Sequence, residues 1–390
     1  MKDKGARVAV AVLIIIFILL PVGFFVLLMA AFGGESDFYH PTVITLFLAV
    51  SVWMIAYALQ AWQKKKMWFL FLGIMLSGTI AIGIHEGQKS YIKNIPVVGD
   101  QGVDLFEYKP FTKDSKIARL NEKATFRMQG ELLSIDGATA LYPLYAAFAE
   151  AVYPEDDYDP YRSNVMSNTT PDAYRRLLSG EADLIFCAAP SRSQVADAKA
   201  DSIEFNMTAI GKEAFVFFVN TENPVSELTV EQIQDIYSGK ITNWKDVGGK
   251  DEEIKAFQRP KNSGSQTMLE KIMEDKPLMN PPLNNRVGGM GEIIDRTAQY
   301  KNFANAIGYT FLFFATEMIG NNQIKLIKVN GIEANRKTIE TGTYPFTGDF
   351  YAITTDSKNE NITGFIDWIL SPQGQLLVEK TGYTPLKTDN

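Results

Sequence analysis

The sequence predicts an α/β domain preceded by three transmembrane helices. Two observations carry this prediction. In the first part of the 390-residue chain, three apolar runs occupy residues 8–32, 42–62 and 67–84, and each approaches the ~20 residues that a helix needs to cross a bilayer. Beyond residue 130, short apolar segments typical of strands alternate with helical stretches, which indicates α/β architecture with mostly parallel sheets.

Charged residues between the apolar runs predict the orientation of the chain in the membrane. Lys2, Lys4 and Arg7 precede the first run, and three lysines at 64–66 separate the second run from the third. The loop at 33–41 carries two acidic residues and no lysine or arginine. The positive-inside rule therefore predicts a multi-pass protein of the cell membrane with a cytoplasmic N-terminus and an extracytoplasmic C-terminal domain.

The first apolar run has alternative interpretations. Its length and the two runs that follow it argue against a cleaved signal peptide. Pro21 and Gly23 lie in the middle of the run. Transmembrane helices tolerate both residues, but a kinked first helix stays open as an alternative, as does a helical hairpin with one misread segment.

Composition favours a binding protein over an enzyme. The formal charge of −7 and the pI near 5.2 argue against nucleic acid as a partner. The two histidines, His40 and His85, flank the apolar runs, so the domain beyond them lacks the Ser-His and Cys-His pairs of nucleophilic catalysis and most zinc sites. The single cysteine, Cys187, excludes an intramolecular disulfide, and its apolar neighbours predict a buried core residue. We expect no catalytic residue, metal or cofactor.

The region after the apolar runs divides into a linker and a folded domain. Residues 85–130 are polar and contain several glycines and prolines, which predicts a stalk with weak structure. The expected domain spans 131–390, and we expect Thr229 to cap one of its helices. Short apolar runs bounded by turn residues predict strands, and apolar residues spaced by three or four predict helices. The expected strands are 131–135, 183–188, 214–220, 254–258, 307–314 and 350–355, and the expected helices are 138–151, 171–179, 229–238, 265–273, 293–302 and one within 364–380.

Three strand-to-helix turns share one chemistry. Residues 135–142 read Ile-Asp-Gly-Ala-Thr-Ala-Leu-Tyr, residues 167–172 read Ser-Asn-Thr-Thr-Pro-Asp, and residues 259–267 read Arg-Pro-Lys-Asn-Ser-Gly-Ser-Gln-Thr. In the second turn, Thr170 is the expected N-cap and Pro171 the first helical residue. Free N–H groups at a helix start, with hydroxyls beside them, can bind an anion. One such turn is usually an ordinary cap, but three in one α/β domain favour an oxyanion at the carboxyl ends of the strands.

These turns and several further motifs resemble a known family. The soluble part is similar to the phosphate-binding component of bacterial phosphate ABC importers, over about residues 131–386. The most specific stretches are Ile-Tyr-Ser-Gly-Lys-Ile-Thr-Asn-Trp, which ends at residue 244, and Ser-Pro-Gln-Gly-Gln, which begins at residue 371. The other matching segments are 137–143, 178–183, 259–265, 307–309 and 382–386.

The resemblance implies a fold, a ligand and partners. The fold would be the two-lobed type II periplasmic-binding-protein fold, with lobe 1 at about 131–210 plus 345–390 and lobe 2 at about 211–344. The ligand would be phosphate or a similar oxyanion. The partners would be ABC permease and ATPase subunits on separate chains, together with membrane lipid. In the second turn Thr169 and Thr170 are preferred to Ser167. The implied ligand-binding residues are Ala138, Thr139, Thr169, Thr170, Arg259, Ser263, Gly264 and Ser265.

Two positions depart from the family pattern. Ala188 stands where the family has the aspartate that accepts the proton of hydrogen phosphate, and Lys261 stands where it has an acidic residue. A carboxylate acceptor makes a site selective for a protonated oxyanion, because it repels an unprotonated one. Without one, we expect sulfate to be rejected less strongly and phosphate affinity to hold or rise between about pH 6 and pH 8. Glu213 or Asp349 could restore the carboxylate if it enters the site.

The leading interpretation is a membrane-tethered solute-binding protein that delivers an oxyanion, with phosphate as the expected ligand, to an ABC importer. The alternative is a sensor or assembly module that keeps the binding-protein fold with weak phosphate affinity or none. The two altered positions favour this alternative. An enzyme ranks third, because the chemistry of nucleophilic catalysis is missing from the domain.

Overall fold

The structure is a computed structural model that describes residues 2–32, 36–94, 97–98, 103–259, 261–280, 300–301, 304–318 and 324–387. The chain forms two compact units, one made by the N-terminal helices and one made by the α/β domain.

The N-terminal unit contains three helices that are long and apolar enough to cross a membrane, as the sequence predicts. The candidate spans are Lys4–Met29, Phe38–Ala58 and Lys64–Gly87. Large apolar side chains point away from the helix contacts, for example Phe17 at 72% exposure and Phe69 at 65%, which suits a lipid environment. The helical segments are α1 (Lys2–Ile14), the π-helical turn η1 (Ile15–Leu19), α2 (Leu20–Phe32), α3 (Ser36–Ala58) and α4 (Lys64–Asn94).

The first span is a single helical path with a π-helical turn in its middle. Residues Ile15–Leu19 form this turn, which ends two residues before Pro21. A proline has no N–H to donate to the preceding turn, and a wider local turn is a common adjustment to that loss.

The expected stalk differs from the structure at both of its ends. Helix α4 continues past residue 84 to Asn94, and the three lysines at 64–66 form its first turn. From residue 103 onwards the chain packs on the α/β domain, where Leu105, Tyr108 and Met128 are buried in the core. Apolar residues spaced widely along a polar segment give no periodic signal, so the sequence did not indicate this packing.

A mixed sheet organises the α/β domain. Its strand order is β2-β3-β11-β4-β8-β6, and β9 pairs with β4 beside this path. Among the described residues of this sheet, the β2–β3 and β6–β8 pairs are parallel, and β11 and β4 run antiparallel to their neighbours. The expectation of mostly parallel sheets is therefore wrong. The strands are β2 (Ile135–Gly137), β3 (Leu184–Cys187), β4 (Asn206–Asn220), β6 (Lys255–Ala256), β8 (Ala306–Phe311), β9 (Ile324–Leu326) and β11 (Thr347–Thr354).

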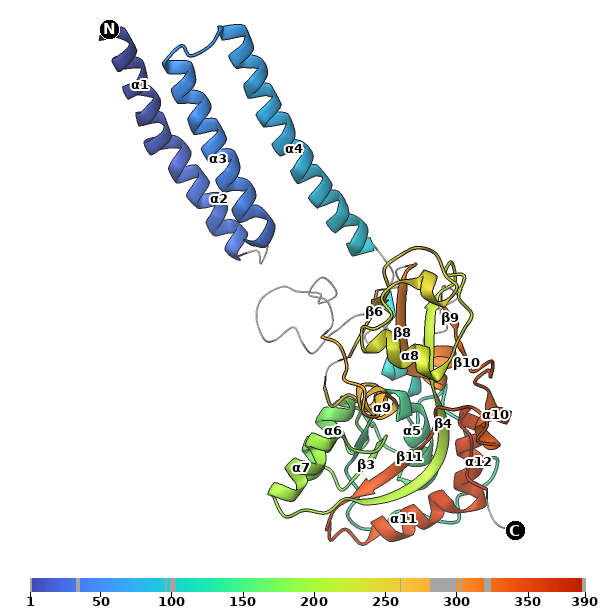
Figure 1. Cartoon of the computed structure of the whole chain (residues 1–390). Helices are drawn as coiled ribbons and strands as arrows, with labels where there is room; N and C mark the ends of the chain where they lie inside the picture. The colour runs from blue at the N-terminus through green and yellow to red at the C-terminus, as the bar shows by residue number, and fades with distance from the viewer. Residues whose placement is uncertain are drawn as a thin grey trace. The chain divides into compact units, whose positions relative to one another are not determined.

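Strand β4 connects two lobes. Its first part pairs with β11, and from Phe215 it pairs with β8 (Figure 1). The register of β4 against β11 shifts between Phe350 and Tyr351, so that Ile210 is an extra residue on β4. The carbonyl of Ile210 accepts a hydrogen bond from Gln375 Nε2 at 3.0 Å, which satisfies a backbone group that the bulge removes from the ladder.

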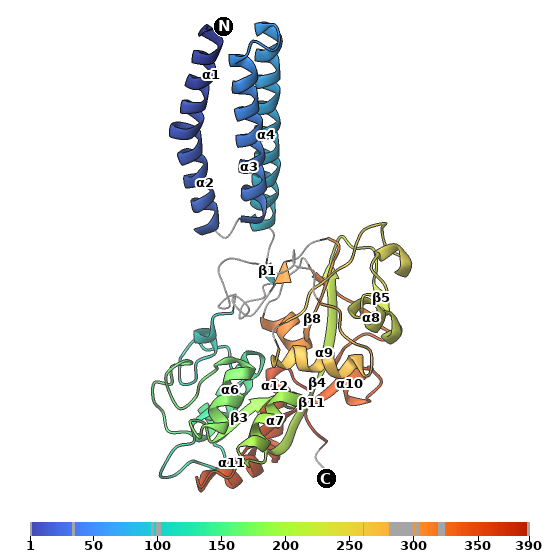
Figure 2. The same cartoon turned by 60° about the vertical axis from the view of Figure 1, so that its left-hand side comes forward.

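Each lobe has its own hydrophobic core. Helices α5, α11 and α12 pack together in lobe 1, where Phe148 lies 6.0 Å from Trp368 between ring centroids. Helices α8 and α9 cover the second core, which contains Trp244 (Figure 2). The helices are α5 (Tyr142–Val152), α6 (Thr169–Leu178), α7 (Arg192–Ala200), α8 (Val230–Tyr237), α9 (Gly264–Met273), α10 (Arg336–Glu340), α11 (Asn361–Leu370) and α12 (Pro372–Thr381).

Most expected elements are present with shifted ends. The helix expected at 138–151 begins as a 3-10 turn, the closing helix is divided at Ser371 before Pro372, and α7 was not expected. The helix expected at 293–302 lies outside the described residues except for 300–301, which form a strand. Thr229 caps α8 as expected. The remaining elements are β1 (Val97–Val98), η3 (Leu105–Tyr108), η4 (Thr139–Leu141), β5 (Glu227–Leu228), η5 (Trp244–Val247), β7 (Tyr300–Lys301), η8 (Phe314–Met318) and β10 (Lys328–Val329).

Candidate functional site

The turns that the sequence singles out meet at one cavity. The cavity has a volume of about 90 Å³ and is lined by Ala138, Thr170 and Gly264, which belong to the first, second and third turn. Ordinary pockets for organic ligands occupy ~300–1,000 Å³. The volume therefore suits a small ion and is too small for a sugar or a peptide.

Direct distances show how closely the second and third turns approach each other. A Cβ atom built on Gly264 would lie 3.3 Å from Thr170 Oγ1 and 3.8 Å from Ala188 Cβ. Gly264 is the first residue of α9, and Thr170 lies in the first turn of α6. Two helix N-termini, each with unsatisfied N–H groups and a partial positive charge, therefore adjoin one small space.

One face of α9 forms a wall of the cavity. The lining residues on this helix are Gly264, Thr267, Met268 and Lys271. Their spacing of three, one and three residues places them on a single helical face. Helix-start chemistry indicated only Gly264 from this face, although the helical period would have indicated the other three.

The first turn requires glycine for a close backbone approach. A Cβ on Gly137 would lie 2.5 Å from the carbonyl oxygen of Phe186 and 2.9 Å from Tyr145 Cε1. The next residue, Ala138, donates its backbone N–H to the same Phe186 carbonyl at 2.9 Å. The Ala138 amide is thus already used within the protein, and Ala138 reaches the cavity only as a lining residue.

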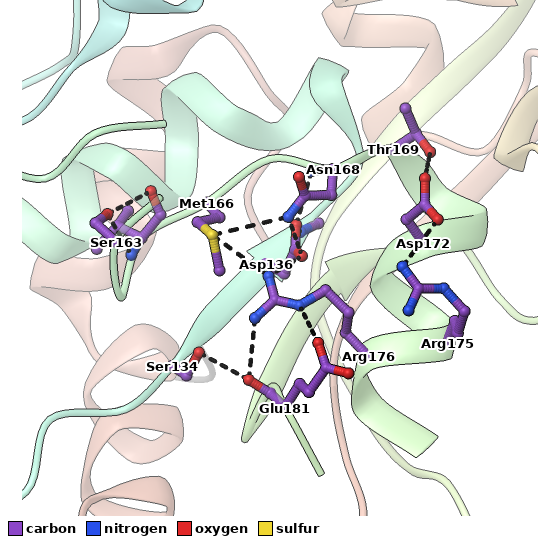
Figure 3. A network of polar contacts seen from close by, with 12 residues as sticks. Ser134, Asp136, Ser163, Met166, Asn168, Thr169, Asp172, Arg175, Arg176 and Glu181 are labelled. Atoms are coloured by element: carbon purple, nitrogen blue, oxygen red, sulfur yellow. Dashed lines mark hydrogen bonds and ion pairs between the residues drawn. The ribbon is translucent and has the colours of Figure 1, made fainter. Parts of the chain in front are cut away.

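A buried carboxylate holds the first and second turns together. Asp136 is fully buried, and its Oδ1 accepts hydrogen bonds from the backbone N–H of Gly137 at 2.7 Å and of Asn168 at 2.9 Å. Its Oδ2 accepts from Asn168 Nδ2 at 2.9 Å and from Arg176 Nη1 at 3.1 Å (Figure 3). Because one side chain bonds both turns, it fixes their spacing.

Arg176 neutralises the charge of this carboxylate. The Arg176 side chain is 12% exposed and comes from α6, and its Nε also lies 3.4 Å from Glu181 Oε2. A buried carboxylate beside an anion site would repel the ligand if it were unpaired. The Asp136–Arg176 pair keeps the rigid hydrogen-bond acceptor while cancelling its charge.

Two non-glycine residues next to the site have positive φ angles. Thr169, before Thr170, has φ of 74°, and Asn262, before Ser263, has φ of 67°. Non-glycine residues adopt this region at some cost, and such residues are frequent at binding sites. Asn262 Oδ1 accepts hydrogen bonds from Ser191 Oγ at 2.9 Å and Ser193 Oγ at 2.6 Å, which connects the third turn to the N-terminus of α7.

The other predicted site residues lie around the cavity but do not line it. Thr139 begins η4, and Thr169 rather than Thr170 begins α6, with Asn168 as the N-cap, so the predicted Thr170 cap is wrong. Ser263 caps α9, where its Oγ accepts from the Gln266 N–H at 3.3 Å. The remaining predicted residues, Arg259 and Ser265, are half-buried and buried.

Hydrogen bonds hold the backbone of the third turn in place at Arg259. Its N–H donates to Tyr309 Oη at 2.8 Å and to Gln266 Oε1 at 2.9 Å. Burial raises the pKa of Tyr309, while Arg259 acts in the opposite direction. The guanidinium group of Arg259 is therefore the cation at the start of the third turn.

The carboxyl groups of the site differ from those of the family pattern. Ala188 lines the cavity, and Lys261 is exposed and does not line it. Glu213 and Asp349, the two residues that could restore a carboxylate, both line the cavity. Glu213 is buried, whereas Asp349 is exposed.

Glu213 has an unusual environment for a carboxyl group. Burial raises the pKa of Glu213 to about 8, and the backbone N–H of Phe313, which donates to Oε1 at 2.7 Å, offsets only part of this effect. Apolar side chains such as Phe215 and Phe311 form the adjoining walls. A carboxyl group with such a pKa is mostly protonated at neutral pH.

Cys187 is a core residue next to the site. It is fully buried, and burial raises the pKa of its thiol, with the Thr170 hydroxyl and the Ala138 N–H acting in the opposite direction. A neutral thiol in an apolar setting is a poor nucleophile. Within the described part of the chain, no group of three or more His, Cys, Asp or Glu side chains is arranged to hold a metal ion.

Comparisons of the sequence with known proteins all indicate one family. Residues 113–373 match the PBP superfamily domain, where PBP denotes periplasmic binding protein. The phosphate-binding protein PstS of Borreliella burgdorferi is 28% identical over 188 residues, which are 46% of this chain and 66% of that protein. The phosphate-binding protein PstS of Bacillus subtilis is 24% identical over 260 residues, which are 65% of this chain and 80% of that protein.

One solved structure supports the same fold. It is a substrate-binding protein from Clostridium perfringens, assigned to a phosphate ABC transporter and crystallised with bound phosphate. The structural match has a TM-score of 0.50 and 25% sequence identity, and it covers 65% of this chain and 99% of that chain. These relatives are binding proteins and not enzymes. The matched domain covers more than half of the chain, and the two-lobed α/β domain with its small cavity therefore belongs to the PBP superfamily.

Proposed function

We propose that the protein binds an oxyanion, namely phosphate, on the outer side of a cell membrane and delivers it to an ABC importer. The observation that carries this proposal is the convergence of the N-termini of α6 and α9 on a cavity of about 90 Å³. Helix N-termini favour anions through their free N–H groups and dipoles. The PstS relatives, by their names, bind phosphate.

Side chains near the cavity supply further attraction for an anion. Lys271 lines the wall formed by α9, and Thr170 and Thr267 provide hydroxyl groups. Arg259 lies at the start of the third turn, where the family pattern places the anion-binding arginine. Together these groups provide donors from both lobes, so that ligand binding would favour the closed arrangement of the lobes.

Calorimetric titration tests the proposal. The full chain in detergent micelles is titrated with phosphate, and Arg259→Ala is compared with wild type. A hydrogen bond to a charged group contributes about 1.5–3 kcal/mol, so we expect affinity to fall by roughly 10- to 150-fold. Arg175→Ala is the matched control, because Arg175 is 63% exposed and pairs with Asp172 on the surface. Equal affinity in wild type and Arg259→Ala, with a lower melting temperature, would assign Arg259 to structure instead.

The orientation in the membrane is part of the same proposal. Lysines near the first and third spans favour a cytoplasmic N-terminus, and the permease and ATPase would be separate chains. A Cys187→Ala background allows single cysteines to be placed by Lys65→Cys or Glu222→Cys. A membrane-impermeant maleimide added to intact spheroplasts should label only the second site, and labelling of the first alone would reverse the topology.

A sensor or assembly module is the second candidate function. Two observations favour it: Ala188 replaces an acidic residue of the family pattern, and the Ala138 amide is already bonded to Phe186. If titration shows no phosphate binding by a folded wild-type chain, this second function replaces transport. The three membrane spans would then be the contact surface for a membrane partner.

A further inference from the structure

One buried carboxyl group in the cavity has no role in the function proposed above. Glu213 lies on β4 where the strand stops pairing with β11 and begins to pair with β8. Its side chain is 7% exposed and lines the cavity together with Thr170, Ala188 and Gly264. The residue therefore sits at the junction of the two lobes, beside the helix N-termini that would receive an anion.

The hydrogen bonds of Glu213 leave part of its carboxyl group available. Oε1 accepts from the Phe313 backbone N–H at 2.7 Å. No lysine or arginine of the described residues contributes to its pKa, which burial alone raises to about 8. At pH 7 the group consequently carries a proton that Oε2 can donate, and above pH 8 it becomes a carboxylate that can accept one.

Other titratable groups face Glu213 from the neighbouring elements. Lys271 on α9, and Asp349 and Tyr351 on β11, line the same cavity. Tyr383, which follows α12, is fully buried, and Glu213 contributes to the raised pKa of its phenol. Lys271 and Asp349 are exposed to water, so solvent screens their charges. The raised pKa values of Tyr351 and Tyr383 keep both phenols neutral near pH 7 and pH 8.

We propose that Glu213 shares one proton with the bound anion and thereby sets which anions bind at a given pH. This inference rests on the proposed function as an oxyanion-binding protein. The cavity is small and partly walled by Phe215, Phe311 and Phe350. In such surroundings an ionised carboxylate and a doubly charged anion repel each other strongly, so one proton must lie between them.

The source of that proton differs between two anions of similar shape. Sulfate has no proton near neutral pH, so Glu213 must donate its own, and binding above pH 8 takes up a proton from the solvent. Hydrogen phosphate brings its own proton and can donate it to an ionised Glu213. Phosphate therefore keeps its affinity as the pH rises, while sulfate loses affinity about tenfold between pH 7 and pH 9.

The experiment is calorimetric competition between phosphate and sulfate on the full chain in detergent micelles, at pH 7 and pH 9. Titrations in two buffers of different ionisation enthalpy count the protons taken up. For wild type we expect selectivity for phosphate to rise about tenfold from pH 7 to pH 9, and at pH 9 we expect proton uptake near one for sulfate and near zero for phosphate. Glu213→Gln, which stays neutral, should make both quantities independent of pH. Asp349→Asn tests the other carboxyl group of the cavity, and Asp172→Asn on the surface should keep the wild-type profile.

Each outcome separates this inference from the function on which it rests. Failure of wild type to bind either anion at both pH values overturns the proposed function and this inference together. Binding with no proton uptake by wild type at pH 9 overturns the role of Glu213 alone, without use of any variant. A profile that is flattened by Asp349→Asn and unchanged by Glu213→Gln assigns the shared proton to Asp349 instead.

Discussion

Replacing Asp136 by alanine should destabilise the α/β domain strongly. The change removes four hydrogen bonds of 2.7–3.1 Å, two of them from the backbone N–H groups of Gly137 and Asn168. It also takes from Arg176, whose side chain is 12% exposed, its buried carboxylate partner, while the ion pair with the half-exposed Glu181 at 3.4 Å remains.

The magnitude follows from these contacts. Breaking a buried ion pair by removing one partner costs about 3–5 kcal/mol, and the unpaired backbone N–H groups are part of that loss. The loss is a large fraction of the ~5–15 kcal/mol that stabilises a typical domain. Because Asp136 bonds both the first and the second turn, phosphate affinity should fall as well.

Urea unfolding of the full chain in micelles measures the loss. Trp244 and Trp368 report the two lobes, because each is buried in the core of one lobe. Asp172→Ala is the control, since Asp172 pairs with Arg175 at 3.2 Å on the surface and such a pair contributes about 0–1 kcal/mol.

A double variant separates the charge from the hydrogen bonds. Asp136→Ala combined with Arg176→Met should cost less than the sum of the two single changes, because no unpaired charge is left. The backbone N–H groups of Gly137 and Asn168 would still lack their acceptor, so stability should not return to the wild-type value. A loss below about 1 kcal/mol for Asp136→Ala, equal to that of the surface control, would refute this account of the network.

Three further predictions concern single positions. Gly137→Ala should cost at least about 1–3 kcal/mol of unfolding free energy, because its Cβ would lie 2.5 Å from the Phe186 carbonyl; Gly348→Ala, whose Cβ would lie 3.8 Å from the nearest atom, is the control in urea unfolding. Glu213→Gln should be more stable than wild type by an amount that grows between pH 4.5 and pH 8, because folded wild type there keeps a proton that its unfolded chain has lost. If the urea midpoints of the variant and wild type differed by the same amount at pH 5 and at pH 8, this result would contradict the raised pKa of Glu213. Cys187 should resist maleimide in the folded protein and react after unfolding, since it is fully buried; labelling of the native chain at the unfolded rate would argue against its burial.

Local sequence patterns predicted the parts of the fold that depend on local structure. The three apolar runs, the alternating strands and helices, and the Thr229 cap each depend on residues close together in the sequence, and the structure contains them. The antiparallel course of β4 and β11 depends on pairing between residues 206–214 and 347–354. A strand pattern does not specify its partner or direction, so the sheet was expected to be mostly parallel.

In the candidate site, too, local sequence patterns predicted some residues, while others depend on residues distant in the sequence. The turns that supply Ala138, Thr170 and Gly264 follow from helix-start chemistry, and all three residues line the cavity. Glu213 lies mid-strand with apolar residues after it, and a local pattern cannot tell whether such a side chain faces water or a cavity. Its burial depends on residues far away in the sequence, through the hydrogen bond from Phe313 and the pairing of β4 with β8.

The nested order of the two lobes has a consequence for how the chain matures. The second core uses residues between 214 and 346, whereas the first core joins residues 105–158 to residues 365–383. During synthesis the inner lobe can therefore complete its core while Phe148 still lacks its partners Phe365 and Trp368. The outer lobe, which supplies Ala138 and Thr170 to the cavity, becomes complete only when the last two helices have emerged. A premature stop before residue 361 would thus leave a folded inner lobe attached to an exposed apolar surface, which is a substrate for quality-control proteases.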